Sequence, residues 1–317
     1  MRLFFSTALL LVLFSISFAE TPVKHITVDI NGTGNFTSLQ EAIFSVRAFD
    51  PDGATQIFVK NGVYREKIVI PEWVCNVIIL GESRENTIIT HNDHANINKM
   101  GTFRTYTLQI RGNDIKLENL TVENNAEQLG QAVALHTEGD RLIFKHCRFL
   151  GNQDTQYLAG EGNRLYFENC YIEGTTDFIF GGATAWFEKC DIYCKKNSYI
   201  TAASTPENIK YGFIFNQCKI SVAKEVNSMY LGRPWRAYAM TVFMNCELPG
   251  EINPAGWNNW RNPENEKTAR YAEYNNSGKG SDTTQRVKWI KILSKKEGRR
   301  ITLKRVFNDF YYNIQRL

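Results

Sequence analysis

The chain has 317 residues, with 37 lysines and arginines against 33 aspartates and glutamates, so its formal net charge is +4. A balance so close to neutral argues against a nucleic-acid partner, because such partners select strongly basic surfaces. The length is large for an ordinary compact domain but suits one elongated domain.

The first residues have the pattern of a secretory signal peptide. Arg2 supplies a positive charge, the following residues up to Phe18 are mostly apolar, and Ser17-Phe18-Ala19 is a small-x-small cleavage site. We predict a signal peptide over residues 1–19, one domain over residues 20–317, and a secreted or periplasmic location. A membrane anchor is the alternative, but the apolar run is short for a span and no other stretch is long enough. We expect no membrane association after cleavage.

A short amphipathic helix is predicted next. Apolar residues fall near helical spacing at Phe36, Leu39, Ile43 and Val46. Ser38 followed by Glu41 fits a capping box at the start of this helix. We expect the helix to cover the N-terminal end of the strands that follow, where unpaired strand edges would otherwise meet water.

The middle of the chain repeats one pattern: an aromatic residue, two residues, a cysteine, one residue and an apolar residue. The five cysteines are 23, 20, 28 and 28 residues apart, at Cys147, Cys170, Cys190, Cys218 and Cys246. Self-similarity at this period indicates a solenoid. The segments mix β-branched and aromatic residues with polar ones at alternate places, which is typical of short strands. The repeat predicts an all-β fold, a parallel β-helix. Leucine-rich repeats are the rival, but their signature does not recur.

The repeated cysteine is predicted to form a ladder of small buried apolar side chains, with free thiols at most positions. A disulfide between adjacent turns is the alternative. The segment after Trp289, especially residues 306–314, is expected to cover the C-terminal end of the solenoid.

Two aspartates stand in equivalent places on successive repeats. Asp154 follows Cys147 by seven residues, and Asp177 follows Cys170 by seven. Neighbouring strands lie about 4.8 Å apart, so two such carboxylates would repel, and one pKa should rise while the other stays low. That difference supplies a general acid and an anionic nucleophile at one pH. The alternative is that both are turn aspartates, which are common at strand ends.

Three further polar residues are candidates for the same site. Arg233 could hold a carboxylate ionised, and Gln131 and Gln153 could donate amide hydrogens to an oxyanion. From composition alone, surface positions are the better interpretation of all three residues.

Five motifs together make the chain similar to the pectin methylesterases, or pectinesterases, over roughly residues 25–310. They are Gly62-Val63-Tyr64-Arg65-Glu66, Gln131-Ala132-Val133-Ala134-Leu135, Gly151-Asn152-Gln153-Asp154-Thr155, Asp177-Phe178-Ile179-Phe180-Gly181 and Leu231-Gly232-Arg233-Pro234-Trp235. The resemblance implies a right-handed parallel β-helix and hydrolysis of galacturonate methyl esters in pectin.

The resemblance also assigns roles to residues. It implies that Asp177 is the nucleophile and that Asp154 is first the acid that protonates methanol and then the base that activates water. Gln131 and Gln153 match the oxyanion donors, and Arg233 matches the arginine that hydrogen-bonds the nucleophile. Substrate-binding positions are implied for Trp235 and Phe180. No cofactor or metal is implied, pectin is the expected partner, and we expect a monomer.

Gln156 and Gly182 depart from the usual residues of the family, leucine and asparagine, which leaves the subsite preference open. Three rival functions would need sequence features that this chain lacks. A polygalacturonase-type glycosidase also uses paired aspartates, but its Gly-His-Gly motif is missing. A pectate lyase would hold Ca²⁺ in an acidic cluster, and none is seen. A serine esterase would be expected to show Gly-x-Ser-x-Gly, which is absent. A non-catalytic polysaccharide-binding β-helix is the remaining alternative.

Overall fold

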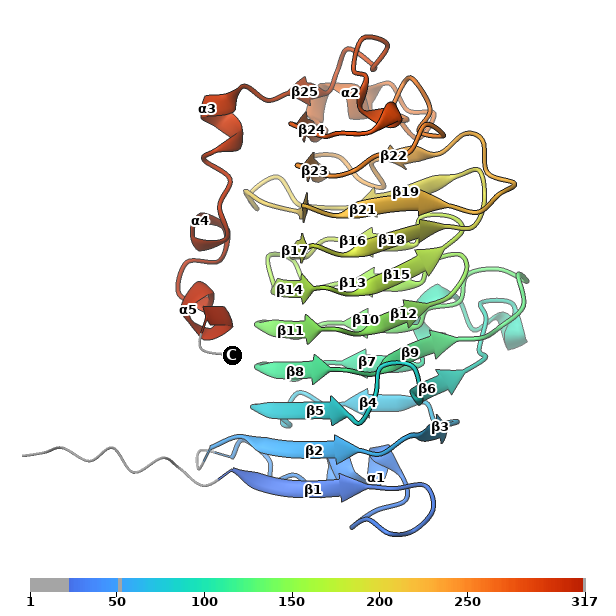
Figure 1. Cartoon of the computed structure of the whole chain (residues 1–317), viewed down its shortest axis with the longest axis vertical. Helices are drawn as coiled ribbons and strands as arrows, with labels where there is room; N and C mark the ends of the chain where they lie inside the picture. Colours follow the sequence, from blue (N-terminus) through green and yellow to red (C-terminus); the bar gives the residue numbers. More distant parts are fainter. Residues whose placement is uncertain (1–22, 51–52, 316–317) are drawn as a thin grey trace, which may run out of the picture.

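The computed structural model describes residues 23–50 and 53–315, and within them 25 strands form three parallel sheets (Figure 1). Sheet A consists, in order of hydrogen bonding, of β1 (Lys24–Val28), β2 (Thr55–Val59), β5 (Val77–Gly81), β8 (Ile115–Glu118), β11 (Leu142–Lys145), β14 (Arg164–Glu168), β17 (Thr184–Glu188), β20 (Phe213–Asn216), β23 (Met240–Met244), β24 (Arg270–Tyr274) and β25 (Lys291–Ile292). The predicted signal peptide lies outside the described residues.

The other two sheets have seven strands each. Sheet B consists of β3 (Gly62–Tyr64), β6 (Thr87–His91), β9 (Thr121–Asn124), β12 (Arg148–Leu150), β15 (Tyr171–Gly174), β18 (Asp191–Cys194) and β21 (Lys219–Val222). Sheet C consists of β4 (Ile68–Ile70), β7 (Leu108–Ile110), β10 (Leu135–Thr137), β13 (Gln156–Leu158), β16 (Ile179–Gly181), β19 (Tyr199–Ala203) and β22 (Tyr230–Gly232). The chain visits A, B and C in turn, so the predicted all-β, right-handed parallel β-helix is confirmed.

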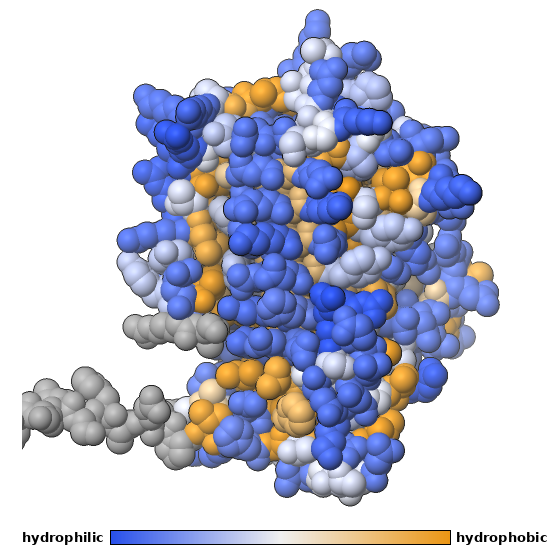
Figure 2. Space-filling model, viewed as in Figure 1, coloured by the Kyte–Doolittle hydropathy of each residue, from blue (hydrophilic) through white to orange (hydrophobic). Residues whose placement is uncertain are grey.

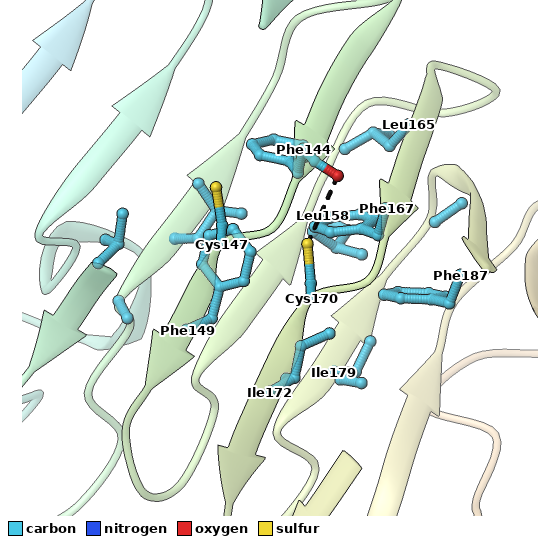
Figure 3. Close-up of a cluster of buried hydrophobic side chains, with 14 of the residues drawn as sticks. Phe144, Cys147, Phe149, Leu158, Leu165, Phe167, Cys170, Ile172, Ile179 and Phe187 are labelled. Carbon is cyan, nitrogen blue, oxygen red and sulfur yellow. Dashed lines mark hydrogen bonds between the residues drawn. The ribbon is translucent and has the colours of Figure 1, made fainter. Parts of the chain in front are cut away.

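The repeat stacks like residues on like inside the solenoid (Figure 3). Five phenylalanine rings lie face to face with centroids 4.4 to 4.7 Å apart, from Phe144 through Phe167, Phe187 and Phe215 to Phe243. Beside them the Cys170 thiol donates to the Phe144 carbonyl of the preceding turn at 3.4 Å. All seven cysteines are free. The predicted ladder of buried thiols is therefore confirmed.

The residue before each ladder cysteine bends the chain from sheet A to sheet B. These residues have positive φ angles between 51° and 56°, and they are His146, Asn169, Lys189, Gln217 and Asn245. Left-handed backbone is uncommon outside glycine and is most frequent at asparagine. The six-residue repeat is thus one strand end, one left-handed turn and the start of the next strand.

The helix α1 (Leu39–Phe44) covers the N-terminal end as predicted, and Leu39 and Ile43 are fully buried in the core of the solenoid. Ser38 accepts the Glu41 N–H, which is half of the predicted capping box. The other half comes from far away, because the Glu66 carboxylate accepts from the Ser38 hydroxyl and from the N–H groups of Leu39 and Gln40.

The prediction for the C-terminal segment is wrong. The segment holds α3 (Lys295–Gly298), α4 (Leu303–Phe307) and α5 (Phe310–Gln315), and it runs back along the outer face of sheet A (Figure 1). The reason is that outward residues of this sheet are large and apolar, including Tyr166, Trp186 and Ile214, and they need cover. Phe307 and Phe310 supply that cover, and they are at most 1% exposed.

The C-terminal end of the solenoid is closed instead by aromatic rings packed edge to face or at a tilt. Trp257 lies 5.9 Å from Phe243 and 4.5 Å from Tyr271, and Trp289 follows Tyr271 at 5.9 Å. The remaining short helices are α2 (Glu264–Thr268), η1 (Ile97–Lys99), η2 (Thr102–Arg104) and η3 (Lys279–Ser281). Over the described ranges, no helix reaches the length and apolar character needed to cross a bilayer.

Candidate active site

The two predicted aspartates occupy equivalent positions on neighbouring turns. Gln156 of β13 pairs with Ile179 of β16. Asp154 lies two residues before Gln156, and Asp177 lies two residues before Ile179. Both have left-handed backbone, with φ of 65° at Asp154 and 48° at Asp177. Because aspartate tolerates this region better than most residues, the same local turn can present a carboxylate on each of two successive turns.

Both carboxylates are buried, and this sets their acidity. Burial, followed by the negative charge of Asp177, raises the pKa of the Asp154 carboxyl well above its ordinary range. Burial also raises the pKa of Asp177, although the hydrogen bonds and positive charge of Arg233 oppose that rise. The expectation that one pKa stays low is therefore not met in full. The asymmetry between the two groups remains, because Arg233 stabilises the ionised form of Asp177 directly.

Arg233 binds Asp177 with two hydrogen bonds. Its Nε donates to Oδ1 at 3.0 Å and its Nη2 to Oδ2 at 2.6 Å. The guanidinium lies between two aromatic rings, 3.9 Å from the centroid of Tyr199 and 3.7 Å from that of Trp260. A planar, doubly stacked guanidinium has one orientation, so it fixes the orientation of the carboxylate as well.

The turn that carries Arg233 depends on the glycine before it. A Cβ at Gly232 would lie 2.0 Å from the Thr201 hydroxyl oxygen on the preceding turn of the solenoid. Only glycine allows β22 to approach β19 this closely. The Arg233 N–H then donates to the Thr201 carbonyl at 2.9 Å, which anchors the arginine backbone above Asp177.

All seven predicted site residues line one open depression of about 220 Å³. They are Gln131, Gln153, Asp154, Asp177, Phe180, Arg233 and Trp235. The rings of Phe180 and Trp235 meet edge to face at 5.8 Å, and they form an apolar wall. Among the described residues, the side-chain amides of the two glutamines have no hydrogen-bond partner and are free to bind a ligand.

Sequence reasoning missed several residues of this depression. Trp260, Phe103, Thr102 and Ala202 also line it. Trp260 and Phe103 come from loops outside the repeat, so no stacking register marks them. The only signal was that Trp260 follows Trp257 closely in a segment rich in asparagine.

For metals, the described part of the chain contains no group of three or more histidine, cysteine, aspartate or glutamate side chains able to hold an ion. The predicted absence of a cofactor stays a prediction. Chemically, the depression combines a carboxyl group with a strongly raised pKa, a second carboxyl group bound by an arginine, and two amides without partners beside an apolar wall. Such a set suits nucleophilic acyl transfer.

Comparison with known proteins shows what the whole chain is similar to. A family model described as pectinesterase matches residues 25–309. Pectinesterase 31 of Arabidopsis thaliana is 38% identical over 284 residues, covering 85% of this chain and 88% of the relative. Other relatives, named as probable pectinesterase/pectinesterase inhibitor proteins, are longer, and the chain spans about half of their length.

Solved structures give the same result. The pectin methylesterase from carrot has a TM-score of 0.82 at 32% identity, covering 87% of this chain and 90% of that one. A pectin methylesterase in complex with a hexasaccharide has a TM-score of 0.79 at 28% identity, covering 92% and 98%.

Proposed function

This chain belongs to the pectinesterase family, and we propose that it acts through Asp177 as nucleophile and Asp154 as acid and base. Like its relatives, it is a carboxylic ester hydrolase that acts on the methyl esters of pectin and releases methanol and pectate. The roles of the individual residues are our proposal, and the geometry of the depression supports them.

In the first step, a carboxylate oxygen of Asp177 attacks the carbonyl carbon of a galacturonate methyl ester. The carbonyl oxygen becomes an oxyanion, and the side-chain amides of Gln131 and Gln153 donate hydrogen bonds to it. When the intermediate collapses, the bond to the methoxy oxygen breaks. Asp154 gives its proton to that oxygen, so neutral methanol leaves and an acyl-enzyme anhydride remains on Asp177.

In the second step, the ionised Asp154 takes a proton from water, which attacks the acyl carbon. A second oxyanion forms at the same two amides and collapses to release Asp177. The products are a galacturonic acid carboxyl group on the polymer, which loses its proton to the solvent, and the starting enzyme, with the other proton of the water on Asp154. The raised pKa of Asp154 suits both steps, because it favours the protonated form that gives a proton to methanol and makes the ionised form a stronger base toward water.

The substrate is held beside the nucleophile by the apolar wall of Phe180 and Trp235, whose rings can pack against sugar faces. We propose pectin as the partner and expect a monomer with no nucleic-acid partner. The signal-like segment at residues 1–19 supports export to a secreted or periplasmic location.

The observation that carries the assignment is the pair of hydrogen bonds from Arg233 to Asp177, next to Asp154, whose pKa burial raises more strongly. A pair of turn aspartates with no chemical role would not need a half-buried arginine held between two aromatic rings. The same arrangement argues against a binding-only solenoid.

The test is methanol release from highly methylated pectin by the purified protein, by Asp177→Asn and by Asp191→Asn. Asp191 is an exposed aspartate of β18, so its variant controls for the loss of one charge. We expect release by the parent and by Asp191→Asn, and a loss of at least about 10³-fold in Asp177→Asn. Substantial release by folded Asp177→Asn would refute the nucleophile. Binding of pectin without methanol release by the parent would favour the non-catalytic alternative.

A further inference from the structure

The near-neutral net charge conceals a strongly basic segment. Residues 286–305 contain nine lysines and arginines and one glutamate, a net charge of +8, whereas the whole chain carries +4. The remaining residues therefore sum to −4. Such asymmetry within one chain indicates a surface that meets an anionic partner.

Most basic side chains of this segment are free to bind an anionic ligand. Seven are exposed and have no ion pair within the described ranges: Lys288, Lys295, Lys296, Arg299, Arg300, Lys304 and Arg305. The nearby acids are already engaged, because Glu297 pairs with Lys291 and Asp309 pairs with Arg164. In Figure 2 the corner of the molecule where α3 lies is coloured as strongly hydrophilic. The local field is thus positive and uncompensated.

Two adjoining hollows run along this segment. One has a volume of about 500 Å³ and the other of about 390 Å³, and they share Lys210, Tyr211 and Arg305. Arg300 lines the larger hollow, together with the apolar side chains of Leu293 and Ile301. The Lys210 ammonium lies 5.0 Å from the centroid of the Tyr211 ring. We call this feature the basic groove.

The basic groove combines the contacts that an acidic sugar polymer requires. An aromatic ring and apolar side chains offer a surface for sugar faces, and arginine guanidinium groups bind carboxylates with paired hydrogen bonds. A purely electrostatic patch would lack the ring and the apolar floor.

We propose that the basic groove is a second, non-catalytic binding site for de-esterified polygalacturonate, the acidic polymer formed by the reaction. This inference rests on the proposed function, which identifies that polymer as the product. The site would retain the stretch of chain that has already lost its methyl groups.

The groove lies within reach of the catalytic depression along the surface. Trp235 of the catalytic depression also lines a third hollow, together with Glu161 and Arg236. Gly162, the residue that follows Glu161 in the chain, lines the basic groove. The loop between β13 and β14 therefore lines both the third hollow and the basic groove, so a polymer that extends from the catalytic depression past this loop would reach the groove.

The test is binding of fully de-esterified polygalacturonate, which offers no ester to cleave, by affinity electrophoresis at low and high salt. The variant Arg300→Glu/Arg305→Glu is compared with Lys219→Glu/Lys224→Glu, which makes the same change in net charge at exposed lysines of β21 and the loop after it. We expect at least about tenfold weaker binding for the first pair at low salt, a smaller difference at high salt, and a change within about twofold for the second pair.

Methanol release by the same preparations from a short methylated oligogalacturonate separates the two proposals. Unchanged release with weakened polymer binding supports the groove, whereas no release by any protein would refute the proposed function instead. Equal weakening by both charge reversals would overturn the groove and leave only a net-charge effect. Binding of duplex DNA or anionic vesicles at the groove without binding of polygalacturonate would overturn it as well. Thermal unfolding checks that both pairs fold.

Discussion

Arg233 and Asp177, 56 residues apart, are joined by two hydrogen bonds of 3.0 and 2.6 Å, with the guanidinium clamped between Tyr199 and Trp260. An ionised carboxylate in a buried site needs such a partner, because burial alone would protonate it. The arginine thus maintains the charge of the proposed nucleophile and also directs its oxygens.

The first prediction concerns the shape of this partner. Arg233→Lys keeps the positive charge but loses the paired hydrogen bonds and the stacking between the rings. We expect kcat for methanol release to fall by about 10²-fold with a smaller change in KM, because the nucleophile is misdirected while the sugar contacts remain. Arg261→Lys, at an exposed position next to Trp260, should be close to the parent. A kcat of Arg233→Lys within about twofold of the parent would exclude an orienting role.

The second prediction concerns pH. The reaction needs Asp177 ionised and Asp154 protonated, and burial raises both pKa values. The profile of kcat/KM should therefore be bell-shaped, rising through the pKa of Asp177 above the ordinary aspartate range and falling as Asp154 loses its proton. Arg233→Gln removes the charge that opposes protonation of Asp177, so its acid limb should move to higher pH. An acid limb that stays in place would show that Asp177 is not the group titrating there.

The third prediction is that Asp154→Asn raises the thermal stability of the protein while it lowers the activity. The pKa of Asp154 is raised in the fold, so the folded state binds more protons than the unfolded state between the ordinary pKa and the raised one. The stabilisation from the protonated form is present at low pH and is lost as pH rises through the folded pKa. Asparagine mimics the protonated form at every pH and tolerates the left-handed backbone of this position.

Asp154→Asn should therefore melt about 2–4 °C above the parent at neutral pH, and the difference should vanish near pH 4. Its methanol release should fall strongly, because an amide can neither protonate the departing methanol nor take a proton from water. Differential scanning calorimetry at the two pH values, with Asp191→Asn as the charge control, makes the comparison. A variant that melts below the parent at neutral pH would contradict the burial argument.

One regular spacing in the sequence was enough to predict much of this site. Asp154 and Asp177 each follow a ladder cysteine by seven residues, and a solenoid with those cysteines in register must bring the aspartates to the same edge. Register in a parallel β-helix carries over from turn to turn, so a local spacing predicts a long-range contact.

The residues that were missed do not obey that register. Trp260 and Phe103 reach the depression from loops whose length and path the repeat does not specify. The prediction for the C-terminal segment was wrong for a related reason. Its docking surface is made by outward residues such as Tyr166 and Trp186, and in the sequence these are indistinguishable from ordinary alternating strand residues. Only the assembled sheet A shows that they form a continuous apolar face.

The fourth prediction tests the ring ladder. Phe187 is fully buried, with ring centroids 4.7 Å from Phe167 and 4.4 Å from Phe215. Phe187→Ala should lower the free energy of unfolding by about 3–5 kcal/mol, because neighbouring turns cannot collapse into the cavity without losing their own register. Urea unfolding measures the loss. Phe44→Ala, at a ring 60% exposed on α1, should change the free energy by no more than about 0.5 kcal/mol. Equal losses of unfolding free energy in both variants would mean that the ring ladder adds no special stability to the fold.

The last prediction decides which carboxylate caps α1. Glu66, which lies two residues after β3, accepts from the N–H groups of Leu39 and Gln40 at 3.0 and 3.1 Å, whereas Glu41 is exposed. Glu66→Ala should cost about 1–2 kcal/mol of unfolding free energy, since it leaves two helix donors at a half-buried terminus without an acceptor. Glu41→Ala should cost no more than about 0.5 kcal/mol.

Hydrogen exchange at the amides of Leu39 and Gln40 gives a second readout, because protection should fall in the first variant and persist in the second. If Glu41→Ala proved the costlier substitution, the local capping box would be the true cap. The Glu66 motif would then have to serve some purpose other than closing the N-terminal end of the solenoid.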